Sequence, residues 1–480
     1  MITAVFFALV LLLIWKYIKS LKKNEEGAIK NLREIPYPNG LPIIGNTLEI
    51  FWNHCDSWKI ARKRALEYYP IYRQKIFNRN IVFLLNPEDI EVILGATNSS
   101  IKGSYYDPFR KLIGNGMAVS NGKSWYNRRK VLTRSFYFSN LRKYISIFNK
   151  EINSLVSRLQ KNLSVPVDVS FHVENMAFKM TNATILGIES SLSDNEAKSY
   201  IDTIKTVTEM MLLEATKPQL KLMWPLSNHN KQQEISVNKM DTYISKVIQE
   251  NLESSRSEKR GNVINILLDN PHVFDKKAVR NEIDTFIFAA QDTTSTALSF
   301  MMMILANYPE HQETLYEEIK KTLSKNQNPT YSNLTNMNYL DRFVKESLRL
   351  YPPFIIMERT LTEEVITKTG YRLPEGTVVL ISLLDIHRNP NLFPEPEKFD
   401  PERFLLDNVV KRHPFSYIPF SAGSRNCIAQ KFAILALKAG ICGILQNFKL
   451  EPVTLIENIK FSHDAILQVE GGIKVKLTKR

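Results

Sequence analysis

The sequence predicts a mainly α-helical protein with a small β-sheet region, arranged as one large domain behind an N-terminal transmembrane helix. Three observations support this class. Long segments place apolar residues three or four positions apart, which is the period of an amphipathic helix. Strand-like runs are short and few. An almost wholly apolar run, followed by lysines, stands at the N-terminus.

The segments with helical periodicity are Asp56–Tyr69, Leu141–Leu163, Ser236–Ser254, Val279–Asn307, Pro309–Ser324, Asp341–Tyr351 and Ile428–Phe448. The strand-like runs are Ile71–Ile76, Ile81–Asn86 and Thr377–Leu383. No internal repeat or low-complexity linker interrupts the chain after residue 46. Residues 47–480 are therefore expected to form a single domain.

The N-terminus is expected to be a membrane anchor. Residues Met1–Trp15 are apolar except for Thr3, and lysines follow from Lys16 onward. The run is shorter than the roughly 20 residues that span a bilayer, but the next residues extend it and lysine stems can snorkel. A cleaved signal peptide would carry its charge before the apolar run. We therefore expect an anchor over 1–21, a linker with a proline-rich hinge over 22–46, and a cytosolic body.

Charge and cysteine content limit the classes of partner and cofactor. Lys and Arg number 63 against 49 acidic residues, a formal charge of +14, which favours a membrane surface, a nucleic acid or an acidic protein without choosing among them. The three cysteines, Cys55, Cys427 and Cys442, form no disulfide framework and indicate a reducing compartment. The sequence has no C-x-x-C or H-E-x-x-H, so neither a structural zinc site nor a zincin is supported.

The segment around Cys427 is the most informative. Most buried cysteines are small hydrophobic residues. Cys427, however, stands just before a predicted helix and two residues after Arg425, and Gly423 permits a sharp backbone turn. A helix N-terminus and a nearby cation both stabilise a thiolate. This environment suits a thiolate bound to heme iron, a ligand that favours O–O cleavage.

The segment Phe420–Ala429 resembles the heme-binding loop of the cytochrome P-450 superfamily, F-x-x-G-x-R-x-C-x-G, with Ala429 in place of the last glycine. The whole chain is similar to the animal and insect members of clan four. This resemblance implies the cytochrome P-450 fold and a heme b whose iron is bound by Cys427. It further implies that Phe420 shields the sulfur and that Arg425 pairs with a heme propionate.

Two other motifs extend the resemblance to the rest of the heme site. Trp125 and Arg129 lie one helical turn apart and are similar to the family's propionate-binding pair, although a basic surface helix would show the same pattern. Arg359 matches a further propionate-binding arginine of the family.

The E-x-x-R and P-E-R-F motifs resemble the family's structural triad, formed here by Glu346, Arg349 and Arg403. Alone, the first motif would describe an ordinary ion pair on a solvated face. The resemblance assigns these three residues to holding the cysteine loop, because a buried carboxylate needs well-placed partners.

The middle of segment 279–307 is the candidate oxygen-activating region. Ala289, Ala290 and Thr293 share one helix face, and the Thr hydroxyl can bond back to a carbonyl one turn earlier. By resemblance, Thr293 and Asp292 are the catalytic pair that delivers protons, and Ala289 and Ala290 lie against the heme. Many relatives carry a heme-esterifying Glu at the position of Ala289. We therefore expect heme that is not covalently attached, and fatty-acid ω-hydroxylation is in doubt.

The resemblance implies a monooxygenase acting on a lipophilic substrate, since the expected lining is apolar. Candidate contacts are Tyr105, Tyr106, Phe286, Ala289, Ala290, Phe354, Ile355, Ile356 and Ile466. Thr293 and Asp292 speak against the first alternative on the same fold, a heme-thiolate isomerase or dehydratase. The departures at Ala290 and Ala429 leave a second alternative open, a non-catalytic binder of hydrophobic ligands.

Electrons are expected from a partner, because the chain has no dinucleotide-binding fingerprint. By resemblance the donor is NADPH–cytochrome P-450 reductase at the endoplasmic reticulum membrane, with cytochrome b5 as a second donor and no nucleic acid as partner. The candidate docking face comprises Lys123, Arg128, Lys130, Arg134, Lys431 and Lys438.

Overall fold

The computed structural model describes residues 32–41, 44–52, 57–76, 79–95, 100–187, 194–216, 227–253, 261–462 and 466–480. The predicted anchor, residues 1–21, lies outside the described residues, as do residues 22–31 and 42–43 of the predicted linker and hinge. Within the described ranges, no helix is long and apolar enough to cross a membrane.

Helices make up most of the described chain, and the strands form small sheets, which confirms the predicted fold class. The α-helices are α2 (Thr47–Trp52), α3 (Ser57–Glu67), α4 (Pro87–Gly95), α5 (Arg110–Ile113), α6 (Gly122–Leu132), α7 (Phe138–Leu159), α8 (Val169–Thr181), α9 (Asp194–Thr216), α10 (Asn228–Glu253), α11 (Val263–Leu268), α12 (Lys276–Asn307), α13 (Pro309–Thr322), α14 (Tyr331–Asn336), α15 (Asn338–Leu350), α16 (Leu383–His387), α17 (Leu406–Val409) and α18 (Gln430–Asn447). The strands are β1 (Ile71–Ile76), β2 (Arg79–Leu84), β3 (Ser100–Ile101), β4 (Pro166–Asp168), β5 (Ile356–Leu361), β6 (Val365–Ile366), β7 (Arg372–Leu373), β8 (Val378–Ser382), β9 (Phe448–Pro452), β10 (Phe461–Ser462), β11 (Gln468–Val469) and β12 (Lys474–Lys479).

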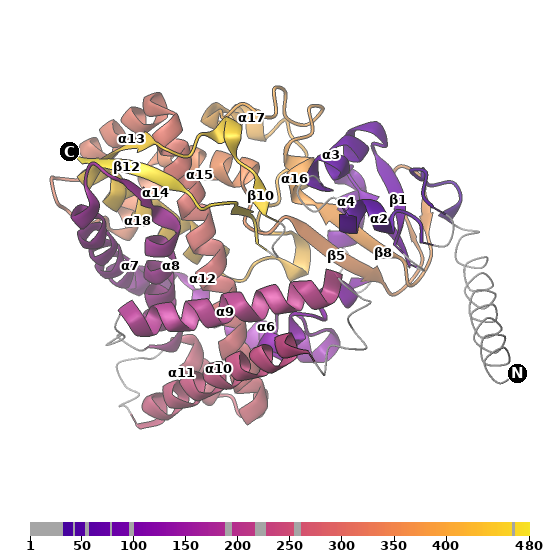
Figure 1. Cartoon of the computed structure of the whole chain (residues 1–480), viewed down its shortest axis with the longest axis horizontal. Helices are drawn as coiled ribbons and strands as arrows, with labels where there is room; N and C mark the ends of the chain where they lie inside the picture. The colour runs from indigo at the N-terminus through magenta and orange to yellow at the C-terminus, as the bar shows by residue number, and fades with distance from the viewer. Residues whose placement is uncertain are drawn as a thin grey trace, which may run out of the picture.

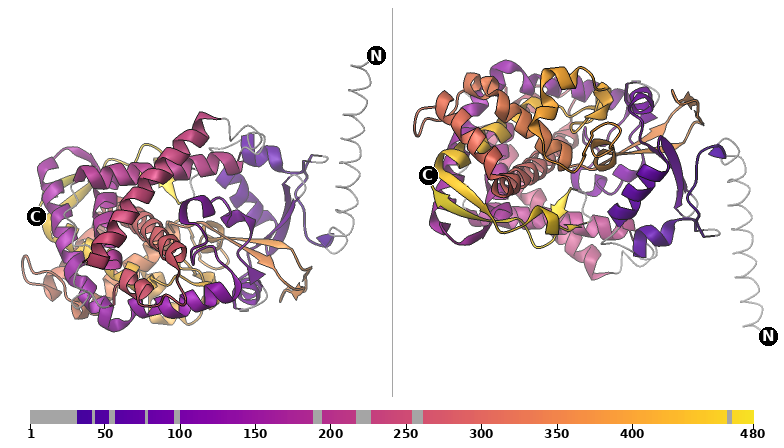
Figure 2. Two further views of the ribbon diagram at one scale, coloured as in Figure 1. Left: turned by 90° about the horizontal axis from the view of Figure 1, so that it is seen from below. Right: turned by 90° about the horizontal axis from the view of Figure 1, so that it is seen from above.

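The long helix α12 runs through the middle of the helical part (Figure 1). Its N-cap is Asp275, whose carboxylate accepts a hydrogen bond of 2.7 Å from the backbone N–H of Ala278. It packs against α8 on one side and α18 on another, and α7 contacts both of those helices. The views from below and above show the same central position (Figure 2).

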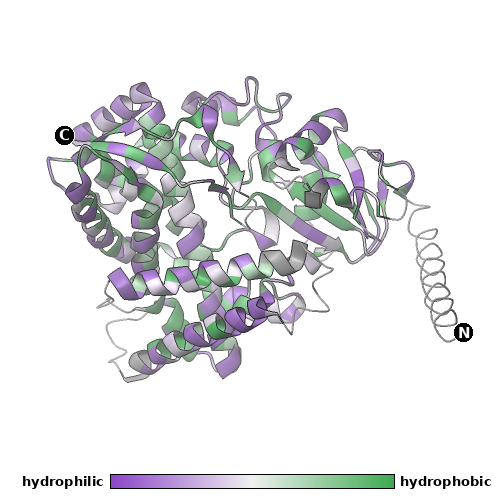
Figure 3. Ribbon diagram, viewed as in Figure 1, coloured by the Kyte–Doolittle hydropathy of each residue, from purple (hydrophilic) through white to green (hydrophobic). Residues whose placement is uncertain are grey.

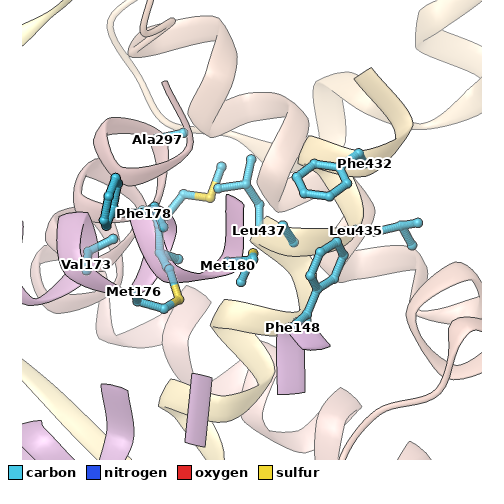
Figure 4. Packing of buried hydrophobic residues seen from close by; sticks show 14 of the residues in the cluster. Phe148, Val173, Met176, Phe178, Met180, Ala297, Phe432, Leu435 and Leu437 are labelled. Atoms are coloured by element: carbon cyan, nitrogen blue, oxygen red, sulfur yellow. The ribbon is translucent and has the colours of Figure 1, made fainter. Parts of the chain in front are cut away.

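The core between these helices is aliphatic, aromatic and rich in methionine. Phe148 of α7, Met180 of α8, Ala297 of α12 and Leu437 of α18 meet in it (Figure 4). The outer helices α9 and α10 lie side by side and mix hydrophilic with hydrophobic residues, as expected for helices that bury one face (Figure 3). A helical scaffold of this kind can hold a rigid cavity along α12.

The largest sheet has the strand order β1-β2-β8-β5-β3 and lies beside the helical part. Strands β2 and β8 pair in parallel, and β3 pairs with β5, so residues near 80 and 100 meet residues near 360 and 380. The register Ile101↔Thr360 brings the segment after β3 alongside Arg359. This pairing between distant segments positions one end of the site described below.

Candidate active site

A large cavity lies along the middle of α12, bounded by the loop before α18, by α5 and α6, and by β5. Its empty space, including the opening, is about 1720 Å³. Its described lining includes Lys102, Arg129, Arg359, Arg425 and Cys427 but no carboxylate.

The cysteine loop follows the turn that the sequence predicts. Gly423 has φ +67°, and a Cβ there would clash with the carbonyl group of Leu94. The backbone N–H of Cys427 donates to the carbonyl of Phe420 at 2.8 Å, which closes the loop before α18 begins at Gln430. Cys427 has accessible surface, and it borders the cavity.

The electrostatic surroundings of the thiol differ in one respect from the prediction. Burial raises the pKa of Cys427, while the backbone N–H of Ala429 and the cations Arg129 and Lys102 lower it. Arg425, the cation expected in this role, instead lies over the Trp125 ring at 3.7 Å. It also donates to the Ser120 carbonyl at 2.8 Å and to Asn121 Oδ1 at 2.7 Å. A buried thiol of this kind needs a bound cation or metal to be a stable thiolate.

The predicted triad is assembled and fully enclosed. Arg349 donates from Nε and Nη2 to the two carboxylate oxygens of Glu346, at 2.6 and 2.8 Å. Arg403 Nε lies 3.5 Å from the same carboxylate. Burial raises the pKa of Glu346, and its hydrogen bonds to Arg349 oppose that shift. The carboxylate is therefore held in place by directed bonds rather than by solvent.

His387, which sequence reasoning missed, connects the triad to the cysteine loop. Arg349 donates to its backbone carbonyl at 2.8 Å, and its Nε2 accepts from the backbone N–H of Ile418 at 3.0 Å. Burial and the neighbouring Arg349 lower the pKa of His387 to about 3, so the ring is a neutral acceptor at physiological pH. Ile418 stands two residues before Phe420, so the contact fixes the start of the loop.

Four cationic side chains gather at one end of the cavity. Arg129 donates to the Asn426 carbonyl at 2.7 Å and to its Oδ1 at 2.6 Å, which ties α6 to the cysteine loop. Arg359 is buried on β5 and donates to the carbonyl of Glu358 at 2.8 Å. Arg425 is the third cation. These are three of the predicted propionate residues, and Trp125, the fourth, is buried beside them and also lines the cavity.

Lys102 is the fourth cation, and it was not predicted from the sequence. Its Nζ donates to the carbonyl of Ala118 at 2.5 Å and lies 4.5 Å above the Tyr106 ring. Burial lowers its pKa well below the usual range, the arginines 359 and 425 add to that shift, and Glu358 opposes it. Glu358 itself is fully buried. No sequence motif marks Lys102. It reaches this cluster only because strand β3, which precedes it, pairs with β5.

The α12 wall has the predicted geometry. Ala289, Ala290 and Thr293 all line the cavity, and the Thr293 hydroxyl donates to the Ala289 carbonyl at 2.7 Å. Asp292 is half-buried and is not among the described lining residues. Small side chains and a hydroxyl therefore face the space above the cysteine, with a carboxylate one residue away in the chain.

The predicted substrate contacts divide into two groups. Phe286, Phe354 and Ile466 line the cavity together with the two alanines and Tyr106. Tyr105 and Ile355 are absent from the described lining, and so is Ile356, the first residue of β5. Tyr105 and Ile355 instead pack against the large core, Tyr105 with its ring edge-on to Tyr106 at 5.5 Å. Tyr105 and Ile355 therefore stay predicted contacts that lie outside the described lining.

The predicted docking face also needs correction. Lys438 is 4% exposed and pairs with Asp341 at 2.7 Å. Arg128 pairs with the buried carboxylate of Glu282 at 3.0 Å. Neither side chain is available to a partner. The remaining residues, Lys123, Lys130, Arg134 and Lys431, are exposed around α6 and the start of α18.

These observations test whether a heme fits the site. The four cations of the described lining have no carboxylate beside them within that lining, and two propionates would supply anionic partners at the cationic end. The paired alanines of α12 leave space for a flat ring, and Cys427 offers a sulfur ligand. The residues present therefore fit a heme, and the fold and the site together define the class of heme-thiolate proteins.

Comparison with known proteins agrees with this class. The sequence profile described as Cytochrome P450 matches residues 35–477. Cytochrome P450 4c21 of Blattella germanica is 32% identical over 96% of this chain and 96% of its own. Cytochrome P450 4c3 of Drosophila melanogaster is 30% identical over 95% and 91%. Cytochrome P450 4V2 of Homo sapiens is 30% identical over 94% and 91%.

The chain belongs to the cytochrome P450 family, and its relatives carry family-4 names, as the resemblance to clan four predicted. It is a monooxygenase with a heme-thiolate cofactor.

Proposed function

We propose that this P450 inserts one atom of O₂ into a neutral, lipophilic small molecule, with electrons supplied from NADPH by a reductase at the endoplasmic reticulum membrane. The distribution of charge in the cavity is the observation that supports this class of substrate. The cations of the described lining, Lys102, Arg129, Arg359 and Arg425, belong to the end that suits propionates. The rest of the described lining is uncharged and mostly apolar, so an apolar and uncharged molecule fits it best.

Each site residue has a proposed part in this reaction. Cys427 ligates the iron and Phe420 shields the sulfur. Trp125, Arg129, Arg359, Arg425 and Lys102 hold the propionates. When bound, the heme supplies oxygen activation. Thr293 and Asp292 would form the proton path, Thr293 through its hydroxyl at the cavity wall and Asp292 through its carboxyl group. Ala289 has no group that could esterify heme, so acid extraction should release the cofactor.

The retained hydroxyl favours a monooxygenase over the other chemistries of the fold. Thr293 lines the cavity and its hydroxyl donates to the Ala289 carbonyl, which fixes the hydroxyl at the cavity wall. Neither an isomerase nor a passive ligand binder needs a proton relay at that position.

Product formation with purified components tests the proposed function. The full chain, a microsomal P450 reductase and NADPH should convert an uncharged hydrocarbon substrate to an alcohol that carries one atom of ¹⁸O₂. A protein that binds such a molecule without reductase-dependent product would contradict the proposal.

Charge reversal at Lys123 and Lys130 should slow the reductase-supported reaction by roughly tenfold at low salt, because complementary charge raises the association rate. The effect should shrink as ionic strength rises. Stopped-flow reduction of the heme measures it. Lys239→Glu, an exposed lysine on α10, is the matched control. Equal rates for all variants at low salt would contradict docking on the α6 face.

Replacing Lys102 by methionine should weaken heme retention, because the variant keeps the chain length and removes the charge. Hydrogen bonds to charged groups contribute about 1.5–3 kcal/mol, which predicts heme release faster by roughly 10- to 150-fold. Transfer of heme to excess apomyoglobin measures the rate. Lys143→Met, at an exposed position on α7, should release heme like the unmodified protein. An unchanged rate for Lys102→Met would exclude Lys102 from the propionate site.

A further inference from the structure

The turn of residues 114–117 rests with its backbone directly on α12. Gly114 has φ +54°, and a Cβ at this position would clash with the Asn281 side chain. A Cβ at Gly116 would lie 2.8 Å from the Asn281 carbonyl oxygen and would also clash with the Thr285 hydroxyl. Only glycine allows so close an approach at both positions. The turn is therefore shaped to dock on this part of α12.

A buried carboxylate fastens the turn to the helix. Glu282 of α12 is 0% exposed and accepts a hydrogen bond of 3.0 Å from the backbone N–H of Met117. Its other oxygen accepts from Arg128 Nη1 of α6 at 3.0 Å. Arg128 also donates to the carbonyl of Asn115 at 2.6 Å. One ion pair thus ties three parts of the structure together: α12, the turn and α6.

The segment that this pair holds is a wall of the cavity. Ile113, Met117, Ala118 and Val119 line the cavity, whereas Glu282 and Arg128 are not among its described lining residues. The pair can therefore act on a bound molecule only through the position of the wall. Burial raises the pKa of Glu282 to about 7, against the opposing effects of the Met117 N–H and Arg128. A buried pair of this kind adds little net stability and serves best to specify one arrangement.

We infer that the Glu282–Arg128 pair positions the wall formed by residues 113–119, and so sets the size of apolar ligand that the cavity accepts. Glu282 and Arg128 are positioning residues. This inference rests on the proposed function, because it concerns the molecule bound beside the heme. The Glu282–Arg128 pair would then determine the accepted ligand size from outside the described cavity lining.

The test compares two azole ligands on the heme-loaded full chain. Imidazole binds iron through nitrogen and is too small to reach far into the cavity, whereas 4-phenylimidazole extends an apolar ring toward the walls. The dissociation constant of each is measured from the shift of the Soret band. The ratio of the two dissociation constants cancels any effect of a variant on the heme itself. A change in the ratio therefore measures a change in the position of the cavity wall.

Glu282→Gln keeps an acceptor for the Met117 N–H but loses the charge that attracts Arg128, and Arg128→Met removes the partner. Both variants should change the ratio by about tenfold, since small displacements of a wall have large effects on fit. Arg128→Lys keeps the charge and is the milder variant to use if the other two do not retain heme. We expect it to change the ratio in the same direction. Asp284→Asn is the matched control, because Asp284 is a buried carboxylate on the same helix that pairs with Arg280 at 2.8 Å.

An unchanged ratio in the Glu282 and Arg128 variants would overturn the inference. A parallel change of both dissociation constants would overturn it as well, since that result describes a general effect on the heme. A change of the ratio of equal size in Asp284→Asn would show that any buried charge on α12 influences ligand fit in the same way. That result would also contradict a specific role of the Glu282–Arg128 pair. If the unmodified protein gave no Soret shift with imidazole, the heme assignment itself would fail, which is a different outcome.

Discussion

Replacement of Arg349 by methionine should leave almost no heme-loaded protein. Arg349 is fully buried, holds both oxygens of Glu346, and donates to the carbonyls of His387, Pro396 and Lys398. The variant removes the bidentate partner of a buried carboxylate and leaves it only Arg403, at 3.5 Å, and the backbone N–H of Asp400. Breaking a buried pair in this way costs about 3–5 kcal/mol of folding free energy. It also releases the backbone of His387, whose ring holds the N–H of Ile418 at the start of the cysteine loop.

Heme content per polypeptide and the denaturant midpoint after expression measure this effect. Arg349→Lys should fail similarly, because an ammonium cannot reproduce the bidentate geometry. Arg342→Met is the matched control, since Arg342 lies on the same helix and pairs with the half-exposed Glu402 at 3.1 Å. Partly exposed pairs contribute only about 0–1 kcal/mol. Heme content of Arg349→Met equal to that of the control would contradict a structural role for the triad.

Replacement of Thr293 by alanine should separate oxygen consumption from product formation. The hydroxyl is the polar group that α12 presents beside Ala289 and Ala290, and positioned proton transfer contributes roughly 10²- to 10⁴-fold. Product per NADPH should fall by roughly 10²-fold. NADPH oxidation should continue, because electron delivery does not use this side chain.

Thr293→Ser retains the hydroxyl and should restore most of the coupling. Thr296→Ala, one turn further along α12 and outside the described lining, should leave it unchanged. The ratio of product to NADPH is independent of enzyme concentration, so partial unfolding cannot imitate the effect. Full coupling in Thr293→Ala would remove Thr293 from the proton path.

Local sequence patterns were enough to locate most of the helices that build the site. Helix α12 was predicted to within three residues at its start, and strand β1 was predicted with both of its ends. Helix α8 was missed because it is buried on nearly every face, which removes the polar stripe that reveals an amphipathic helix. Helix α9 does have a periodic apolar stripe, including Ala197, Ile201 and Ile204, so its signal was present and was overlooked.

The parts of the site that lack a motif depend on contacts between distant segments. The pairing of β3 with β5 lets the backbone N–H of Gly103, next to Lys102, donate to Glu358. His387 reaches Ile418 from α16. Nothing in the residues around them marks these positions. The parallel pairing of β2 with β8, almost 300 residues apart, is likewise invisible to a local pattern.

The wrong predictions have the same origin. Residue type marked Arg128 and Lys438 as surface cations, but Arg128 pairs with the buried carboxylate of Glu282. Lys438 is itself buried and pairs with Asp341. The loop around Cys427 was predictable because its glycine, arginine and cysteine have fixed spacing. The cations that lower the pKa of the thiol, Arg129 and Lys102, were not predictable in this way because they come from other elements.

The carbon monoxide difference spectrum of the reduced full chain in membranes tests the central claim most directly. A thiolate on the heme iron predicts the long-wavelength Soret band for which the family is named. Cys427→Ala should lose this band, and Cys442→Ala, at a buried cysteine in α18, should keep it. A band at the shorter wavelength typical of an imidazole ligand, or a long-wavelength band that survives in Cys427→Ala, would contradict Cys427 as the ligand.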